Sequence, residues 1–459
     1  MSESFKIGST LSFLENQRNL ANKRQADARS GDFNEIYFKS DEENLIKQAD
    51  RCLDCGNPYC EWKCPLHNFI PNWLDMVTHG QFEQAASLMH ATNPLPEICG
   101  RVCPQDRLCE QACTLNTGLG AVTIGAIEKN IADQAIANNW RPDLSAVKSL
   151  NKTVAVIGAG PAGLGCAELL TRNGVNVVVY DKYPEIGGLL TFGIPGFKLE
   201  KTILIKRREF LQDIGVKFKL NTEIGKDISI EQLENDYDSL FLGMGTYKPV
   251  NGGIRGKNLP HVIQSLDYLI GNINQQQSYQ MDKNYTDLKG KDVIVLGGGD
   301  TAMDCVRSAV RQQANSVKCV YRKDEAAMPG SKTEVQNAKE EGVQFIFNLQ
   351  PTEITPDGVA FERTDFDELK HKDKTVFLTT DNVILAFGFR ANPANWLDDA
   401  NIKTSDNGLI QTTQTLQTTN KKIYAGGDMV SGADLVVTAI AQGRDAAKQI
   451  LADLGLVDD

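Results

Sequence analysis

A strand, a glycine turn and a helix follow one another twice in this 459-residue chain, and this repetition constrains the fold more than any other feature. The first unit reads TVAVIGAGPAGLGC from residue 153. The second reads DVIVLGGGDTAMDC from residue 292, so Gly297 takes the place of Gly158. In such a unit the glycine turn lets the backbone approach a dinucleotide pyrophosphate, and the helix N-terminus faces it. The two units predict an α/β fold with two Rossmann-like dinucleotide-binding domains.

The first glycine motif has the residue types that a dinucleotide-binding turn requires. Gly158 permits the tight turn, Gly160 lets the backbone approach the pyrophosphate, and Gly163 allows the helix to pack closely on the strand. Asp181 ends the following strand, where a carboxylate accepts hydrogen bonds from ribose hydroxyls. The alternative is a glycine-rich turn that binds no ligand.

The second motif is a GxGxxA variant, and its following strand ends at Tyr321-Arg322-Lys323. An acid at this position would repel the ribose phosphate of NADP, whereas Arg322 and Lys323 would attract it. Arg322 and Lys323 therefore favour NADP(H) over NAD(H). The alternative is that they are ordinary solvated residues at the end of a strand. The candidate NADPH-binding residues are Gly297, Gly299, Asp300, Thr301, Ala302, Arg322 and Lys323.

Two dinucleotide folds in one chain suggest FAD in the first and NADP(H) in the second. The AGGD sequence at 425–428 supports this order, because an acid followed by a helix fits the ribityl and pyrophosphate region of a flavoprotein. Residues 187–201 and 243–249 are expected to be glycine-rich strand ends that lie close to a flat cofactor. The candidate FAD-binding residues are Gly158, Gly160, Pro161, Ala162, Gly163, Asp181, Lys182, Gly188, Leu189, Gly245, Gly427 and Asp428.

The distribution of helix and strand patterns along the sequence predicts three domains. The N-terminal third has little strand pattern, and helices are expected within 41–51 and 68–90. A strand, a glycine turn and a closing helix are expected near the C-terminus, and the polar stretch 271–291 is expected to be a surface loop. The predicted domains are 1–145, mostly helical; 146–248 together with 386–459, FAD-binding; and 249–385, NADPH-binding.

Charge and hydropathy argue against several classes of partner. The net charge is −11, which disfavours nucleic acid and anionic membranes as partners. No apolar run approaches the roughly 18 to 20 residues of a membrane-spanning helix, and the first residues lack the pattern of a secretory signal. We therefore expect a cytoplasmic protein, in which clustered cysteines more often mean metal binding or catalysis than structural disulfides.

Eight of the eleven cysteines form two quartets, with spacings C-x2-C-x4-C-x3-C from Cys52 and C-x3-C-x5-C-x3-C from Cys99. Zinc sites usually come as paired CxxC or with histidines at short spacing. Prolines directly after Cys64 and Cys103 favour iron–sulfur ligation instead, and eight thiols suffice for two four-iron clusters. Zinc binding and thiol–disulfide chemistry stay open as alternatives. The remaining cysteines, expected to be small buried residues, are Cys166, Cys305 and Cys319.

Along the chain, the following features occur in order: the two cysteine quartets, GAGPAG, GGLLTFGIPGFKLEK, GGGDTAMDC, VYRK and AGGD. With these features the chain resembles, over nearly its whole length, the small (beta) subunits of bacterial NADPH-dependent glutamate synthases. This family shares its plan with the N-terminal half of dihydropyrimidine dehydrogenase. The resemblance implies that NADPH gives a hydride to FAD. Electrons then pass through two [4Fe-4S] clusters to a large (alpha) subunit with FMN, where glutamate forms from glutamine and 2-oxoglutarate.

Two other functions stay open. A relative of this family could deliver electrons to ferredoxin or to a sulfur compound. A zinc-stabilised scaffold that senses nucleotide without turnover is the alternative from a different class. No catalytic side chain is expected in the oxidoreductase, because hydride passes directly between bound cofactors.

The resemblance also implies an interleaved set of cluster ligands. The non-cysteine ligand of the second cluster would be Glu128, whereas spacing alone nominates Cys99 in its place. Each cluster would join distant segments and could substitute for a sizeable hydrophobic core. The implied ligands are Cys52, Cys55, Cys60 and Cys113 for cluster one, and Cys64, Cys103, Cys109 and Glu128 for cluster two.

Overall fold

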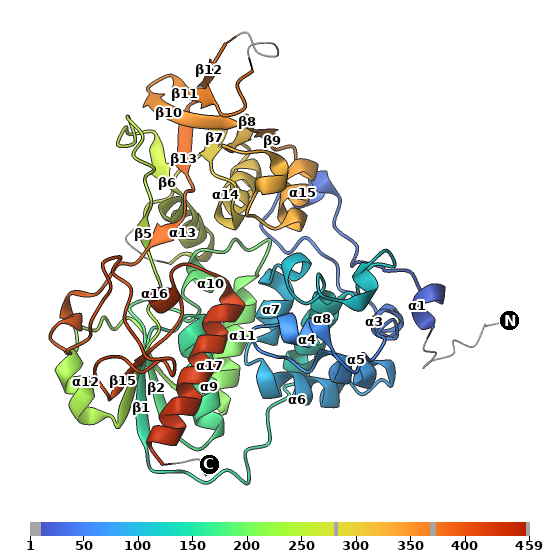
Figure 1. Ribbon diagram of the computed structural model, residues 1–459, viewed down its shortest axis with the longest axis vertical. Coiled ribbons are helices and arrows are strands. Elements are labelled where there is room, and N and C mark those ends of the chain that lie inside the picture. Colours follow the sequence, from blue (N-terminus) through green and yellow to red (C-terminus); the bar gives the residue numbers. More distant parts are fainter. Residues whose placement is uncertain (1–10, 280–282, 368–372, 456–459) are drawn as a thin grey trace.

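The computed structural model describes residues 11–279, 283–367 and 373–455, and its N-terminal part is built of helices joined by loops (Figure 1). Within the described residues before β1 (Thr153–Ile157), extended backbone pairs only at the bridge between Lys23 and Tyr37, which confirms a mostly helical part. The helices are α1 (Ser12–Glu15), α2 (Ala26–Arg29), α3 (Glu42–Ala49), α4 (Tyr59–Lys63), α5 (Ile70–Thr78), α6 (Phe82–Thr92), α7 (Pro96–Val102) and α8 (Ile124–Ala137), with the 3-10 turns η1 (Gln105–Arg107) and η2 (Thr114–Asn116).

Local chemistry explains where these helices begin and end. Asp41 caps α3, because its side chain accepts a hydrogen bond from the Asn44 backbone at 2.7 Å. The helical stretch predicted over 68–90 is divided into α5 and α6 at Gly80, whose φ of 71° a helix interior does not adopt. Trp73 and Leu74 of α5 are buried and belong to the apolar core of this part.

The first parallel sheet has the strand order β15-β4-β1-β2-β3, and the C-terminal strand lies at its edge (Figure 1). Helices α9 and α17 pack together against the buried valines of β1. Glycine turns follow β1 and β15, as the sequence predicts. The elements are β1 (Thr153–Ile157), β2 (Asn176–Tyr180), β3 (Lys217–Lys219), β4 (Ser239–Leu242), β15 (Ile423–Ala425), α9 (Pro161–Arg172), α10 (Leu189–Phe192), α11 (Lys201–Asp213), α12 (Ile230–Asp236), α16 (Asp428–Ser431), α17 (Val436–Asp453) and η4 (Asn395–Leu397).

The second parallel sheet has the order β6-β13-β7-β8-β9 and carries an antiparallel three-stranded sheet, β10-β11-β12, beside it (Figure 1). The short antiparallel pair of β5 and β14 forms where the chain enters and leaves this part. The elements are β5 (Lys248–Pro249), β6 (Val262–Gln264), β7 (Asp292–Leu296), β8 (Ser316–Val320), β9 (Gln344–Ile346), β10 (Leu349–Thr355), β11 (Gly358–Arg363), β12 (Thr375–Thr379), β13 (Asn382–Leu385), β14 (Phe389–Arg390), α13 (Ser265–Gln277), α14 (Asp300–Arg311), α15 (Lys332–Glu340) and η3 (Glu325–Ala327).

These two sheets confirm the predicted α/β class, but two local expectations are wrong. The stretch 271–291 begins inside α13, because Ile270 and Ile273 are buried and hold a mainly polar sequence in a helix. Residues 280–282 of that stretch lie outside the described residues. The segment 187–201 contains the short helix α10 where a strand end was expected.

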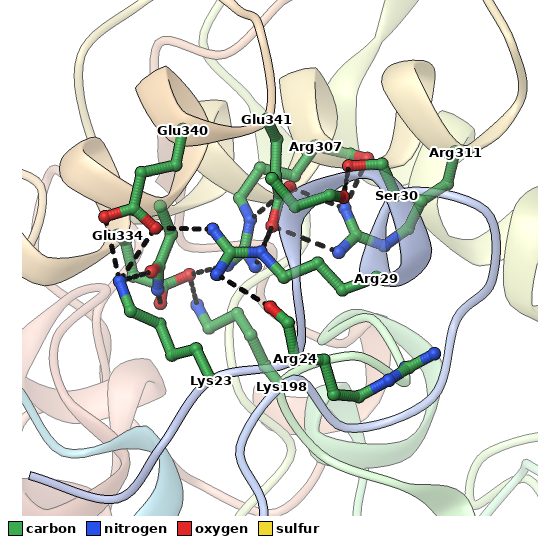
Figure 2. A network of polar contacts seen from close by, with 12 residues as sticks. Lys23, Arg24, Arg29, Ser30, Lys198, Arg307, Arg311, Glu334, Glu340 and Glu341 are labelled. Carbon is green, nitrogen blue, oxygen red and sulfur yellow. Dashed lines mark hydrogen bonds and ion pairs between the residues drawn. The ribbon is translucent and has the colours of Figure 1, made fainter.

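A segment near the N-terminus, residues 19–38, which we call the strap, runs across to the second sheet (Figure 1). Figure 2 shows its contacts with α14 and α15. Lys23 donates to Glu340 at 2.8 Å, and the buried Arg29 donates to Glu340 at 2.7 Å and to Glu341 at 3.1 Å. The strap also reaches α11, because the Glu35 backbone donates to Glu200, the residue before this helix, at 3.1 Å. It therefore joins parts of the chain that are hundreds of residues apart.

Among the described residues, no helix combines the length and the hydropathy that crossing a lipid bilayer requires.

Candidate functional site

One large cavity, with a volume of about 1170 Å³, lies where the three parts of the chain meet. Both glycine turns line it, and so does the loop that follows Cys103. Pockets for single small ligands usually measure about 300–1,000 Å³, so this cavity has room for more than one cofactor end. Of the candidate FAD residues, those that line it are Gly158, Gly160, Pro161, Ala162, Asp181, Lys182, Gly188, Leu189, Gly245, Gly427 and Asp428.

The first glycine turn is closely packed on one side and open on the other. A Cβ at Gly163 would lie 1.9 Å from the Gly158 carbonyl oxygen, so Gly163 packs beneath the turn and does not line the cavity. A Cβ at Gly160 would meet nothing closer than the Gly243 carbonyl at 3.8 Å. The turn therefore leaves space above Gly160, at the start of α9, where a pyrophosphate would be held by helix N–H groups.

The Asp181 carboxylate lies at the end of β2 and orders the same turn. It accepts hydrogen bonds from the Ala159 backbone at 2.7 Å and from the Tyr183 backbone at 2.9 Å. Burial raises the pKa of Asp181, and these two hydrogen bonds oppose that rise. Each carboxylate oxygen accepts one N–H and keeps a second lone pair, so Asp181 can still accept a ribose hydroxyl.

Two aromatic residues, Tyr183 and Tyr247, also line the cavity near Asp181, and neither was among the candidates chosen from the sequence. Lys182 lies 5.1 Å from the ring centre of Tyr183 and 5.9 Å from that of Tyr247. Tyr247 follows the glycine-rich segment 243–245, and this closeness in sequence is the one feature that could have indicated Tyr247 as a cofactor-binding residue. Asp428, at the start of α16, has its pKa raised to about 6 by burial.

The second glycine turn places only part of the candidate NADPH set at the cavity. Gly299, Asp300 and Thr301 line it, whereas Ala302 is buried in the core behind the turn. Arg322 and Lys323 follow β8 as expected, but both are exposed and neither lines the cavity.

Four of the clustered cysteines surround a small second cavity of about 20 Å³. They are the four that the family resemblance assigns to cluster one. Burial raises the pKa of Cys52 to about 11 and that of Cys60 to about 12, so neither thiol ionises readily without a neighbouring positive charge. The cysteines that line this cavity are Cys52, Cys55, Cys60 and Cys113.

The other cysteines gather around Glu128. The pKa of Cys103 is raised well above its ordinary value, first by a hydrogen bond with Cys99 and then by burial, with Glu128 and Cys109 adding to the rise. The Glu128 carboxylate also raises the pKa of Cys64, whose largest cause is burial. Cys64, Cys103, Cys109, Glu128 and the alternative Cys99 thus belong to one neighbourhood.

Glu128 and Cys99 share a hydrogen-bond partner. Glu128 Oε1 accepts from Asn93 at 2.8 Å, and Cys99 Sγ donates to the same asparagine at 3.6 Å. Burial raises the pKa of Glu128 to about 8. Within the described residues, no three His, Cys, Asp or Glu side chains converge on a point that could hold a single metal ion. The predicted buried cysteines, Cys166, Cys305 and Cys319, lie in the cores, as expected.

Comparisons with known proteins agree with this arrangement. Residues 29–140 match the family described as dihydropyrimidine dehydrogenase domain II, 4Fe-4S cluster, and residues 152–443 match pyridine nucleotide-disulphide oxidoreductase. The first match indicates a domain that binds a 4Fe-4S cluster, and the second indicates one that binds FAD and a pyridine nucleotide.

Full-length relatives and solved structures extend these matches. The chain is 52% identical to the glutamate synthase [NADPH] small chain of Halomonas elongata, over 97% of this chain and 98% of that protein. It is 51% identical to the protein of the same name from Escherichia coli, over 96% and 98%. The structure of Mycobacterium tuberculosis FprA in complex with NADPH shares the fold, with a TM-score of 0.53 and 17% identity over 66% of this chain and 84% of that one. The chain therefore belongs to the family of glutamate synthase [NADPH] small chains, which are oxidoreductases.

Proposed function

We propose that this chain is the electron-input subunit of a glutamate synthase. The second glycine turn would bind NADPH and the first would bind FAD, which when bound would accept the hydride, and the clustered cysteines would hold two [4Fe-4S] clusters that carry the electrons onward. The acceptor is a large subunit with FMN, which forms glutamate from glutamine and 2-oxoglutarate. The observation that carries this proposal is the single cavity lined by both glycine turns and by Cys103.

The residues of this chain bind and position the cofactors. Bound FAD would supply the exchange between a two-electron donor and one-electron acceptors. The N-terminus of α9 and Asp181 fit its pyrophosphate and ribose, while the open space above Gly160 fits the close approach of the backbone. The glycine-rich walls would leave room for two flat rings, and the three surrounding parts of the chain would position the rings and limit the access of water to them. No side chain has to act as an acid or a base.

The position of Cys103 at the large cavity suggests the order in which electrons would pass through the two clusters. Cys103 lines the large cavity, so the cluster of Cys64, Cys103, Cys109 and Glu128 is proposed as the first acceptor. The cluster of Cys52, Cys55, Cys60 and Cys113 would be the second. Its helix α4 exposes two aromatic residues, Tyr59 at 56% and Trp62 at 66%. We propose that electrons leave to the large subunit beside these rings.

The preference for NADPH is tested at the end of β8. The double substitution of Arg322 and Lys323 to glutamine is expected to raise the Michaelis constant for NADPH far more than that for NADH, because only NADPH carries the ribose phosphate. The assay is anaerobic reduction of an artificial one-electron dye, which needs no large subunit. Equal effects on the two nucleotides would contradict the assignment. The proposed domain boundaries remain 1–145, 146–248 with 386–459, and 249–385.

A further inference from the structure

The loop after Cys103 leaves the helical part and touches the second glycine turn. Arg107, at the end of η1, donates from Nη1 to the Pro329 carbonyl at 2.7 Å and from Nη2 to Asp300 Oδ2 at 3.3 Å. Its neighbour Asp106 accepts a hydrogen bond from the Lys332 backbone at 3.2 Å. A segment next to a proposed cluster ligand is thus bonded directly to the start of α14.

These contacts hold the turn in shape while leaving its centre open. Gly330 donates to the Gly298 carbonyl at 3.0 Å, and the Ser331 backbone donates to Asp300 Oδ1 at 2.8 Å. Both oxygens of Asp300 therefore have partners. A Cβ at Gly299 would meet only Pro329 Cγ, at 4.0 Å, so there is space above the turn.

Arg107 has hydrogen-bonding capacity that the protein does not use. A guanidinium has five N–H donors, and the hydrogen bonds of Arg107 within the described residues use two of them. Its side chain is 43% exposed, and it lines the large cavity together with Gly299 and Thr301. A planar guanidinium is well suited to paired hydrogen bonds with phosphate oxygens.

The charges around the second glycine turn also favour a role for Arg107 in binding a pyrophosphate. A nucleotide pyrophosphate is an anion, and the free N–H groups at the start of α14 would attract it. The Asp300 carboxylate lies at the same helix end and would repel it. Arg107 pairs with Asp300 and offsets that repulsion.

We propose that Arg107 binds the pyrophosphate of the pyridine nucleotide, so that the cysteine-bearing part contributes a residue to the nucleotide site of the second sheet. This inference rests on the proposed function. Because NADPH and NADH share the pyrophosphate, Arg107 serves both nucleotides. Arg322 and Lys323 would distinguish them through the ribose phosphate.

The test is isothermal titration of the oxidised holoprotein with NADP⁺, NAD⁺ and 2′-AMP, which has the ribose phosphate but no pyrophosphate. Loss of a charge-assisted hydrogen bond in R107Q is expected to weaken NADP⁺ and NAD⁺ about tenfold or more and to leave 2′-AMP unchanged. R107K should fall in between. R255Q is the matched control, since Arg255 makes a similar exposed ion pair, with Glu353 at 3.6 Å, away from the cavity. Flavin and iron contents equal to wild type show that each variant is folded.

Three results would overturn the inference. The first is an R107Q protein that binds NADP⁺ as the wild type does. The second is an equal loss for 2′-AMP, which would mean general damage to the site. The third is recovery of NADP⁺ affinity in the R107Q/D300N double variant, which would mean that Arg107 acts only by neutralising Asp300. If the wild type itself binds neither dinucleotide, the proposed function fails and the inference fails with it.

Discussion

Glu341 is the centre of the buried ion network in Figure 2, and its replacement by glutamine gives a sharp test of how the second sheet is stabilised. Its carboxylate accepts five hydrogen bonds of 2.7–3.2 Å from Arg29, Arg307 and Arg311. Burial alone would raise its pKa, but the hydrogen bonds and charges of these arginines outweigh burial and lower the pKa from 4.5 to about 2. At about 1.4 kcal/mol per pKa unit, the charge of Glu341 stabilises the folded state by about 3 kcal/mol at neutral pH.

The assay is native-state hydrogen exchange at the β7 amides, which exchange when this part of the chain unfolds. At pH 7, E341Q should speed their exchange roughly 150-fold, which corresponds to about 3 kcal/mol. Because the folded pKa is lowered, the contribution is present above pH 4.5 and disappears as the pH falls towards 2. E325Q is the matched control: Glu325 pairs with Lys339 at the exposed surface, and such pairs contribute about 0–1 kcal/mol. An E341Q effect no larger than that of E325Q would refute the reasoning.

Three further predictions concern the cofactor sites. C113S should lose about half of the bound iron, because one of two clusters loses a ligand, whereas C319S in the core should keep all of it; equal iron contents would refute the interleaved ligand set. G160A should fold with reduced flavin, since its Cβ has space in the protein but would enter the pyrophosphate site, whereas G163A should also unfold at lower temperature because its Cβ would lie 1.9 Å from a carbonyl oxygen; full flavin in G160A would contradict this. W62A should lower glutamate formation with the large subunit but keep dye reduction by NADPH, and unchanged glutamate formation would exclude Trp62 from the exit.

The glycine turns could be predicted from the sequence because their signals are local. Gly158, Gly160 and Asp181 lie within one β-α-β unit, and turn, helix start and strand end each require particular residue types. The grouping of Cys113 with Cys52 is different, because spacing within each quartet suggests another arrangement. Only the resemblance to a known family suggested the interleaved set, and the small second cavity is lined by the four cysteines of its first cluster.

Contacts between distant segments gave no signal in the sequence. Arg29 and Glu341 are 312 positions apart, and nothing around Arg29 indicates that it is buried against α15. Arg107 lies between Cys103 and Cys109, and no local pattern indicates its contact with Asp300. The helix at 271–277 was missed because its composition is polar, whereas burial of Ile273 against the core decides its structure. In this helix tertiary packing overrides local propensity, whereas the contacts of Arg29 and Arg107 depend on residues that are distant in the sequence.

The most direct test of the proposed relay is anaerobic titration of the purified protein with NADPH, followed in the visible spectrum and combined with iron, sulfide and flavin analysis. We expect one flavin that bleaches on addition of NADPH, and about eight irons per chain, as two four-iron clusters require. A flavin-loaded protein that NADPH does not bleach, or a protein prepared without oxygen that contains no iron, would contradict the account.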